Sequence, residues 1–416
     1  MLAVAQFHAP LPLTNTIQRY DWGSVDAIPD LLRTEPDGGP QAEMWLGAHT
    51  SAPSVSRITR EDDVDRVALD RLVREAPVQT LGHRVAEQFG PRLPYLLKVL
   101  AARKALSLQV HPSPRQAREG FTRENKAGMP LTSAKRSFKD DQHKPEMIVA
   151  LTQFEGLAGF RTPRTILDVL EGLSGEMVAS VRAALLHDRS HDGMRDAFNH
   201  LLSARADEAC AADIEATLDS VRARLAAGSP FERADRTVVD LAEQHPGDPG
   251  AIASLMLNRF SLEPGEAAFT PAGVVHAYLS GVGIEIMASS DNVLRAGLTT
   301  KLVDEENLVA CTVFAPQQPA APEVTTAGNR GQVRTYRVPV TEFALTTADV
   351  DPAEPVALPA TGPRILLCLD GELTLTADRS EEGPRRLTQG ESVFVPHDAG
   401  NLELTGAGHA ACAWVP

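Results

Sequence analysis

The chain has 416 residues, which is enough for two or three domains and a sizeable core. Its formal net charge of −15 argues against a nucleic-acid partner, because binding a phosphate backbone needs clustered Lys and Arg. The four cysteines are scattered without a C-x-x-C pair, which argues against a thiolate metal site and favours a reducing compartment. The sequence shows neither a signal peptide nor an apolar run near the ~20 residues of a membrane span. We therefore expect a cytoplasmic protein with no membrane partner.

Strand-like pieces over residues 11–60 and an apolar strand over 94–100 predict mostly β-structure in the first part of the chain. Lys98 lies inside the second run. Desolvating an ammonium group is costly, so an inward Lys98 would need an anionic partner such as Glu43 or a substrate. The alternative is an outward lysine on a hydrated face.

A further strand is predicted over 105–112, where apolar residues alternate with polar ones and a proline ends the run. Side chains two positions apart share one face of a strand. Ser107, Gln109 and His111 therefore project together, and the last two form half of a possible metal site. The polar, helix-like residues 113–140 that follow are either a lid over that site or a solvated insertion.

Two later stretches could complete the metal site. Pro145 keeps Lys144 extended, so Lys144 and Glu146 can face one cavity. His276 opens a strand after the turns of Gly265–Gly273. These ligands would supply two nitrogens and two oxygens, a set that suits zinc without excluding iron or manganese. The four candidate ligands are Gln109, His111, Glu146 and His276.

Residues 161–259 have a helical pattern, with Thr162 as the N-cap of the first helix and Pro163 in its first turn. We expect an inserted helical domain there. The spacings of its histidines build no metal site, and we interpret them as surface residues: His187, His191, His200 and His245.

Strands return after residue 260. Glu285, between two isoleucines, is either the polar face of a hydrated strand or a pocket carboxylate, and we favour the pocket. Arg295 and Lys301 could bind phosphate. Beyond a Pro/Ala-rich linker, Gly390–Pro396 repeats Gly265–Pro271, with no histidine in the position that matches His276. The repeat predicts a second sheet domain without a metal site.

The spacing G-x5-P-x-G-x2-H in Gly265–His276 resembles the second motif of the cupin superfamily. The chain as a whole resembles the type I mannose-6-phosphate isomerase family from about residue 14 to residue 314. The segments that carry this resemblance are Tyr20–Ser24, Ala42–Thr50, Leu106–Pro112, His143–Met147 and Ser289–Lys301.

The resemblance implies a mainly β fold with an inserted α-helical domain. Residues 1–160 together with 260–318 would form a cupin-type jelly-roll catalytic barrel. Residues 161–259 would form the helical domain, and 319–416 a degenerate C-terminal jelly roll.

The resemblance also implies the reversible isomerisation of mannose 6-phosphate and fructose 6-phosphate through a metal-stabilised enediolate, with one Zn²⁺ per chain. The chain would act in carbohydrate metabolism as a monomer whose partner is the sugar phosphate alone. Arg295 would be catalytic, and Glu285 is our first choice of base, ahead of Lys144. Ser107, Lys98 and Lys301 are our choices for the phosphate. The candidate substrate-binding residues are Trp22, Glu43, Lys98, Ser107, Tyr278 and Lys301.

Two other functions are compatible with a metal-binding sheet protein of this kind. A metal-dependent cupin oxygenase would bind iron and consume oxygen. A non-enzymatic sugar-binding cupin would tolerate the loss of Arg295 or Glu285, but both are present.

Overall fold

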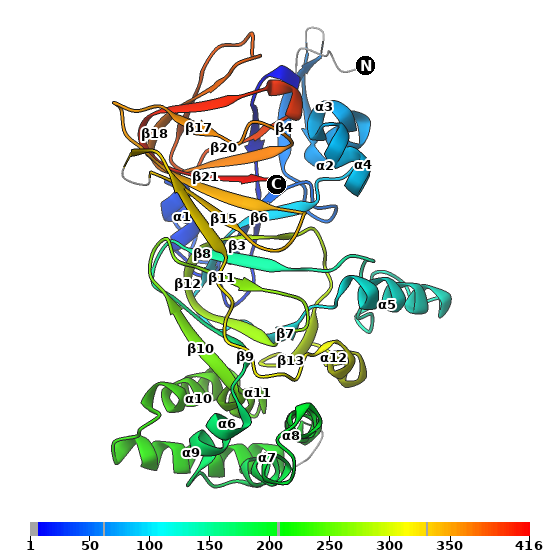
Figure 1. Ribbon diagram of the computed structural model, residues 1–416, viewed down its shortest axis with the longest axis vertical. Helices are drawn as coiled ribbons and strands as arrows, with labels where there is room; N and C mark the ends of the chain where they lie inside the picture. The colour runs from blue at the N-terminus through cyan, green and yellow to red at the C-terminus, as the bar shows by residue number, and fades with distance from the viewer. Residues whose placement is uncertain (1–6, 61–62, 206–208, 330–331) are drawn as a thin grey trace.

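The computed structural model describes residues 7–60, 63–205, 209–329 and 332–416. A sheet built largely from C-terminal strands forms one end of the molecule, a second sheet lies in the middle, and a helical unit forms the other end (Figure 1). The sheet-rich fold with several helices agrees with the prediction from the sequence. Within the described residues, no helix has both the length and the apolar character needed to cross a membrane.

The middle sheet is organised around one long strand, β12. Its first residues pair with β7 and β9, and its later residues pair with β6 and β8. The strands of this sheet are β2 (Thr16–Gln18), β3 (Glu43–Gly47), β6 (Tyr95–Ala102), β7 (Leu108–Val110), β8 (Glu146–Ala150), β9 (Phe154–Phe160), β10 (Leu257–Leu262), β11 (Ala267–Thr270), β12 (His276–Ala288) and β13 (Leu294–Gly297).

Alternation along these strands separates an apolar face from a polar one. Leu97 on β6 and Ile284 on β12 are buried in the same core as Phe394 of the C-terminal strands, so this face packs against the other sheet. Lys98 and Glu285, one position further along each strand, face the opposite way into a cavity. The alternation therefore builds the core and the site from the same strands.

The other sheet, at the end of the molecule away from the helical unit, contains strands from both ends of the chain. Leu11 on β1 is in register with Phe394 on β20, and the other end of β1 pairs with β4. Its strands are β1 (Leu11–Thr14), β4 (Val55–Arg60), β5 (Asp63–Ala68), β14 (Glu323–Ala327), β15 (Val333–Arg337), β16 (Ala344–Val350), β17 (Val356–Leu358), β18 (Arg364–Ala377), β19 (Arg385–Thr388), β20 (Ser392–Val395) and β21 (Leu402–Trp414). The predicted domain limits remain a prediction, and three N-terminal strands lie in the sheet of the C-terminal ones.

The helical unit is an insertion between two paired strands. The chain leaves the middle sheet after β9 and returns on β10, and these strands are antiparallel neighbours. Thr162 caps the first helix by accepting a hydrogen bond from Thr165 N at 3.2 Å, and Pro163 follows it, as predicted. The apolar core of the unit is continuous with that of β7 and β13. Its helices are α6 (Pro163–Leu170), α7 (Glu176–His187), α8 (His191–Ala204), α9 (Cys210–Ala226), α10 (Glu232–Gln244) and α11 (Gly250–Ala253).

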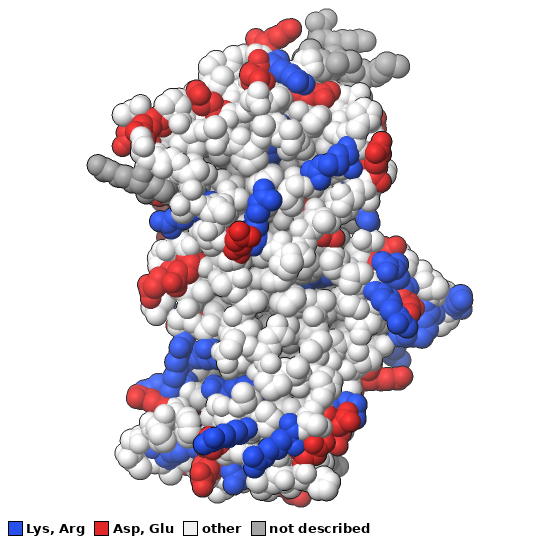
Figure 2. All heavy atoms as spheres, in the orientation of Figure 1, with Lys and Arg blue, Asp and Glu red and all other residues white. Residues whose placement is uncertain are grey.

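The remaining helices are α1 (Ala27–Leu32), α2 (Leu69–Glu75), α3 (Pro77–Leu81), α4 (His83–Phe89), α5 (Pro114–Lys126) and α12 (Glu305–Cys311). Helix α5 begins at a capping box formed by Ser113 and Gln116, and it projects from the side of the middle sheet (Figure 1). Lys and Arg side chains gather over this projection (Figure 2). No residue of 113–140, all of which are described, lines the cavity that Lys98 and Glu285 face, which favours the solvated insertion over the lid.

Candidate active site

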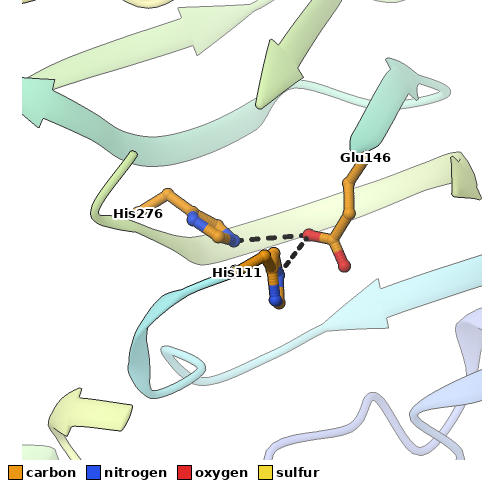
Figure 3. Close-up of side chains that lie close together, drawn as sticks. All are labelled: His111, Glu146 and His276. Carbon is orange, nitrogen blue, oxygen red and sulfur yellow. Dashed lines mark ion pairs between the residues drawn. The ribbon is translucent and has the colours of Figure 1, made fainter. Parts of the chain in front are cut away.

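Three buried side chains from separate strands converge on one point (Figure 3). His111 follows β7, Glu146 opens β8 and His276 opens β12. The Nε2 atoms of His111 and His276 each lie 3.3 Å from Oε2 of Glu146. Residues more than 160 positions apart in the sequence thus form one compact cluster.

Hydrogen bonds from the Nδ1 atoms fix the orientation of the two histidine rings. His111 Nδ1 donates to the backbone carbonyl of Asn292 at 2.7 Å, and His276 Nδ1 donates to that of Val274 at 2.9 Å. In the neutral rings, both Nε2 lone pairs therefore point toward the Glu146 carboxylate. These two Nε2 atoms and Glu146 Oε2 are buried without a hydrogen-bond partner.

Three converging acceptors without a donor between them would repel one another unless a cation bridges them. The cluster therefore fits a metal ion with nitrogen and oxygen ligands. Gln109 is in register with His276 across β7 and β12, and with Arg295 across β7 and β13. Its role as the fourth ligand remains a prediction that this neighbourhood supports.

Electrostatics keep His111 and Glu146 in the protonation states that bind a metal ion. Burial, reinforced by the Lys144 ammonium, lowers the pKa of His111 to about 4, so that the ring is neutral. Burial alone would raise the pKa of Glu146, but the Lys144 ammonium holds this pKa well below its ordinary value. Lys144 Nζ hydrogen-bonds to Oε1, the carboxylate oxygen that does not face the histidines.

A cavity of about 440 Å³ opens beside this cluster. Every other predicted site residue lines it, whereas His111 and His276 lie against Glu146. The structure therefore brings the whole predicted set together, while the individual roles remain predictions. The predicted residues in the cavity wall are Trp22, Glu43, Lys98, Ser107, Gln109, Lys144, Glu146, Tyr278, Glu285, Arg295 and Lys301.

One wall carries a row of charged and aromatic side chains. Trp45, Lys98 and Glu285 are in register across β3, β6 and β12. Lys98 Nζ lies 3.0 Å from Glu285 Oε2 and 3.4 Å from Glu43 Oε1, so the inward lysine has its anionic partners. Burial opposes its charge, but the carboxylates outweigh burial and raise the pKa of Lys98. Trp45 Nε1 donates to Glu43 Oε2 at 2.6 Å and fixes that carboxylate.

Replacing Lys98 by methionine should lower the free energy of unfolding by about 3–5 kcal/mol, because buried carboxylates lose their counter-charge. The cost should shrink as the pH falls from 8 to 5, since the stranded carboxylates then have raised pKa values and take up protons. Urea unfolding at both pH values measures this. The double variant Lys98→Met/Glu285→Gln should recover part of the loss, and a loss that does not depend on pH would contradict the argument.

The sequence did not identify several cavity residues. His49 is buried, and its Nε2 lies 3.4 Å from Asp291 Oδ1 at the cavity wall. His245 was expected at the surface; it is half-buried, and it lines the cavity together with Gln244. His187, His191 and His200 are exposed as expected. No spacing in the sequence relates the end of α10 to β7, which is why this contribution of the insertion was missed.

Arg295 and Lys301 lie close enough in the cavity wall to influence each other, and the Asp21 carboxylate also acts on Lys301. We call this part of the wall, with Thr299 and Thr300, the cationic end of the cavity, and Lys104 lines the same cavity. Burial, reinforced by the neighbouring Arg295, lowers the pKa of Lys301. Such an end suits a small dianion better than a neutral sugar ring.

Comparisons with known proteins agree on one family. The model of the phosphomannose isomerase type I catalytic domain matches residues 11–163, and that of the phosphomannose isomerase type I C-terminal domain matches residues 336–380. The mannose-6-phosphate isomerase of Salmonella typhimurium is 37% identical over 402 residues, covering 96% of this chain and 98% of the relative. That of Escherichia coli is 36% identical over the same shares.

Solved structures extend the likeness to three dimensions. A crystal structure described as zinc-bound mannose 6-phosphate isomerase superposes with a TM-score of 0.85 at 34% identity, covering 98% of this chain and 99% of that chain. A variant of the phosphomannose isomerase from Salmonella typhimurium superposes with a TM-score of 0.86 at 33% identity over the same shares.

Proposed function

Because the chain belongs to the type I phosphomannose isomerase family, we infer that it interconverts mannose 6-phosphate and fructose 6-phosphate with one zinc ion. One observation carries this inference. The side chains of His111, Glu146 and His276 meet without a hydrogen-bond donor between them, beside a cavity that has a cationic end. Full-length similarity to isomerases disfavours both the oxygenase and the non-enzymatic sugar-binding protein.

We further propose that both sheets are cupin-type jelly rolls. The middle sheet would be the catalytic one, and the sheet of C-terminal strands a degenerate copy, in which Asn401 stands at the position that matches His276. The four cysteines are buried and scattered along the sequence, which fits a reducing compartment such as the cytoplasm. We propose that the chain acts there as a monomer on a free sugar phosphate.

Gln109, His111, Glu146 and His276 would hold the zinc ion. When bound, zinc supplies a Lewis acid for the negative charge that develops on the sugar oxygens. Arg295, in register with Gln109 on the neighbouring strand, adds a fixed positive charge at the same face. We assign Arg295 to charge stabilisation rather than proton transfer, because a guanidinium does not readily give up its proton.

Glu285 is our choice of base. The reaction moves a proton from the carbon beside the carbonyl, which leaves an enediolate, and a carboxylate can accept this proton. Burial raises the pKa of Glu285 and so makes it a stronger base, although the Lys98 ammonium opposes that rise. Lys144 is less suited, because its Nζ already donates to Glu146.

The sugar would lie between aromatic side chains. The Tyr278 hydroxyl is buried at the cavity without a hydrogen-bond partner, so it is free to bind a sugar hydroxyl. Trp22, stacked on Tyr20 at a centroid distance of 5.6 Å, offers an apolar wall. We assign the phosphate to Ser107 and Lys301. Lys98, held between Glu43 and Glu285, is better placed for the sugar than for the phosphate.

The first experiment is fructose 6-phosphate formation from mannose 6-phosphate before and after treatment with a chelator. We expect activity to disappear with the chelator and to return when zinc is added. A folded, zinc-loaded protein without turnover would overturn the proposed function. Bound iron and oxygen uptake would then support the oxygenase instead.

A further inference from the structure

We propose that the helical insertion shapes the phosphate end of the cavity, with Asp248 as the positioning residue for the loop Leu298–Lys301. Asp248 lies between α10 and α11, outside the cavity wall. The inference rests on the proposed function in one respect, namely that Lys301 binds the substrate's phosphate. It assigns to the insertion a part in substrate affinity.

The loop begins in a backbone conformation that needs support. Leu298 has a φ of +55°, and only one other non-glycine residue in the described part of the chain has a positive φ. A branched side chain is disfavoured in this left-handed region, so the conformation persists only where its surroundings hold it. Leu298, Thr299, Thr300 and Lys301 all line the cavity.

The insertion holds this loop through its backbone. Thr299 N donates to Asp248 Oδ2 at 3.0 Å, and Arg205 Nη1 donates to Thr299 O at 3.2 Å. Both polar groups of the Thr299 backbone are therefore bound by side chains of the insertion. Arg205 Nη2 also lies 2.8 Å from each oxygen of Asp248, so the two terminal nitrogens of Arg205 form a fork between this carboxylate and the Thr299 carbonyl.

Close backbone contact reinforces this anchor. Gly250 N donates to Asp248 Oδ1 at 2.8 Å. A Cβ atom placed on Gly250 would lie only 2.8 Å from Leu298 N, and one on Gly297 only 2.8 Å from Gly250 Cα. Two glycines thus let the start of α11 touch the strand end that leads into the loop. Asp248 itself is only 8% exposed.

The insertion also contacts a second segment of the cavity wall. Gln244 Oε1 accepts a hydrogen bond from Ala105 N at 2.8 Å, between Lys104 and Ser107 in the sequence. Gln244 and His245 both line the cavity. The end of α10 and the segment after it therefore contact both segments that carry the proposed phosphate ligands.

The test is Asp248→Asn in the full-length, zinc-loaded protein. The amide has nearly the same shape as the carboxylate, but one of its two oxygens is replaced by an NH₂ group, which is a donor. One of the bonds to the Thr299 N–H, the Gly250 N–H or Arg205 is then lost. We expect KM for mannose 6-phosphate, and the inhibition constant of inorganic phosphate, to rise by about 10- to 100-fold. The kcat value and zinc content should stay close to those of the wild type, because the metal cluster and Glu285 are untouched.

The matched control is Asp235→Asn. Asp235 is fully buried in the same helical unit and accepts a hydrogen bond from Arg224 Nε at 2.8 Å, but it does not contact the loop. It should leave KM and the phosphate constant unchanged. Arg205→Lys is a milder second variant, because it keeps the charge but loses the fork. It should raise both constants by a smaller factor, and it decides the matter if Asp248→Asn does not fold.

Equal effects of Asp248→Asn and Asp235→Asn, or a loss of kcat with KM and the phosphate constant unchanged, would overturn the inference. Failure of the proposed function looks different, because the wild-type protein would then not turn over mannose 6-phosphate. Calorimetric titration of zinc-loaded protein with inorganic phosphate would still compare the variants in that case. Unaltered phosphate affinity in both Asp248→Asn and Arg205→Lys would refute the role of Asp248.

Discussion

Replacing His276 by alanine is expected to remove both the bound zinc and nearly all turnover. The variant loses one of the two imidazoles that face Glu146, and the remaining buried acceptors form an incomplete set. Because a Lewis acid contributes several kcal/mol to the transition state, we expect kcat to fall by about 10³-fold or more. Zinc per chain, measured by elemental analysis after dialysis, should fall in parallel.

The control for this variant is His409→Ala. His409 lies on β21 in the other sheet, its side chain is 58% exposed, and it pairs with Asp349 at 2.9 Å. Its loss should change neither zinc content nor kcat. A His276→Ala protein that keeps one zinc per chain and wild-type turnover would show that the ion is held elsewhere.

Replacing Glu285 by glutamine should lower kcat by about 10²- to 10⁴-fold while KM changes little, because glutamine fills the same space but accepts no proton. Exchange of the hydrogen on C2 of mannose 6-phosphate with solvent deuterium should stop in the variant. This exchange reports proton removal directly, whereas a variant that only binds substrate poorly would still show exchange at saturating substrate.

The pH dependence gives a second readout for the same residue. The base must be ionised, and burial raises the pKa of Glu285. Wild-type activity should therefore fall as the pH decreases through a value above that of an ordinary carboxyl group, and this acidic limb should be absent in Glu285→Gln. If Glu285→Gln exchanges C2 hydrogen at the wild-type rate, then Lys144 becomes the base to test.

The parts of the site that could be predicted from the sequence depend on local strand geometry. Ser107, Gln109 and His111 alternate along one strand, so the face they share follows from the two-residue period alone. The same period placed Lys98 and Glu285 away from the apolar core. The spacing around Pro145 similarly placed Lys144 and Glu146 together. These arguments need no knowledge of which strands are neighbours.

What the sequence did not predict depends on contacts between distant segments. The contact of His49 with Asp291 and the hydrogen bond of Gln244 with Ala105 join segments whose spacing carries no period. In the sequence, Asp248 is one more residue of a Pro/Gly-rich turn. Its contact with the loop Leu298–Lys301 follows only from the packing of α11 against β13. Periodicity reports which face a residue occupies, but not which partner lies opposite.

The pairing of β1 with β20 has a consequence for how the polypeptide acquires its structure. A ribosome makes Leu11 hundreds of residues before Phe394, its partner in register. At about 5–20 residues per second, the first strand waits about 20–80 s for its neighbour. During that time its apolar side chains lack their final cover, while the local contacts of α6–α10 can form as they emerge. The sheet that backs the catalytic strands is therefore the last part to close during synthesis, and refolding at low protein concentration should favour this closure over aggregation.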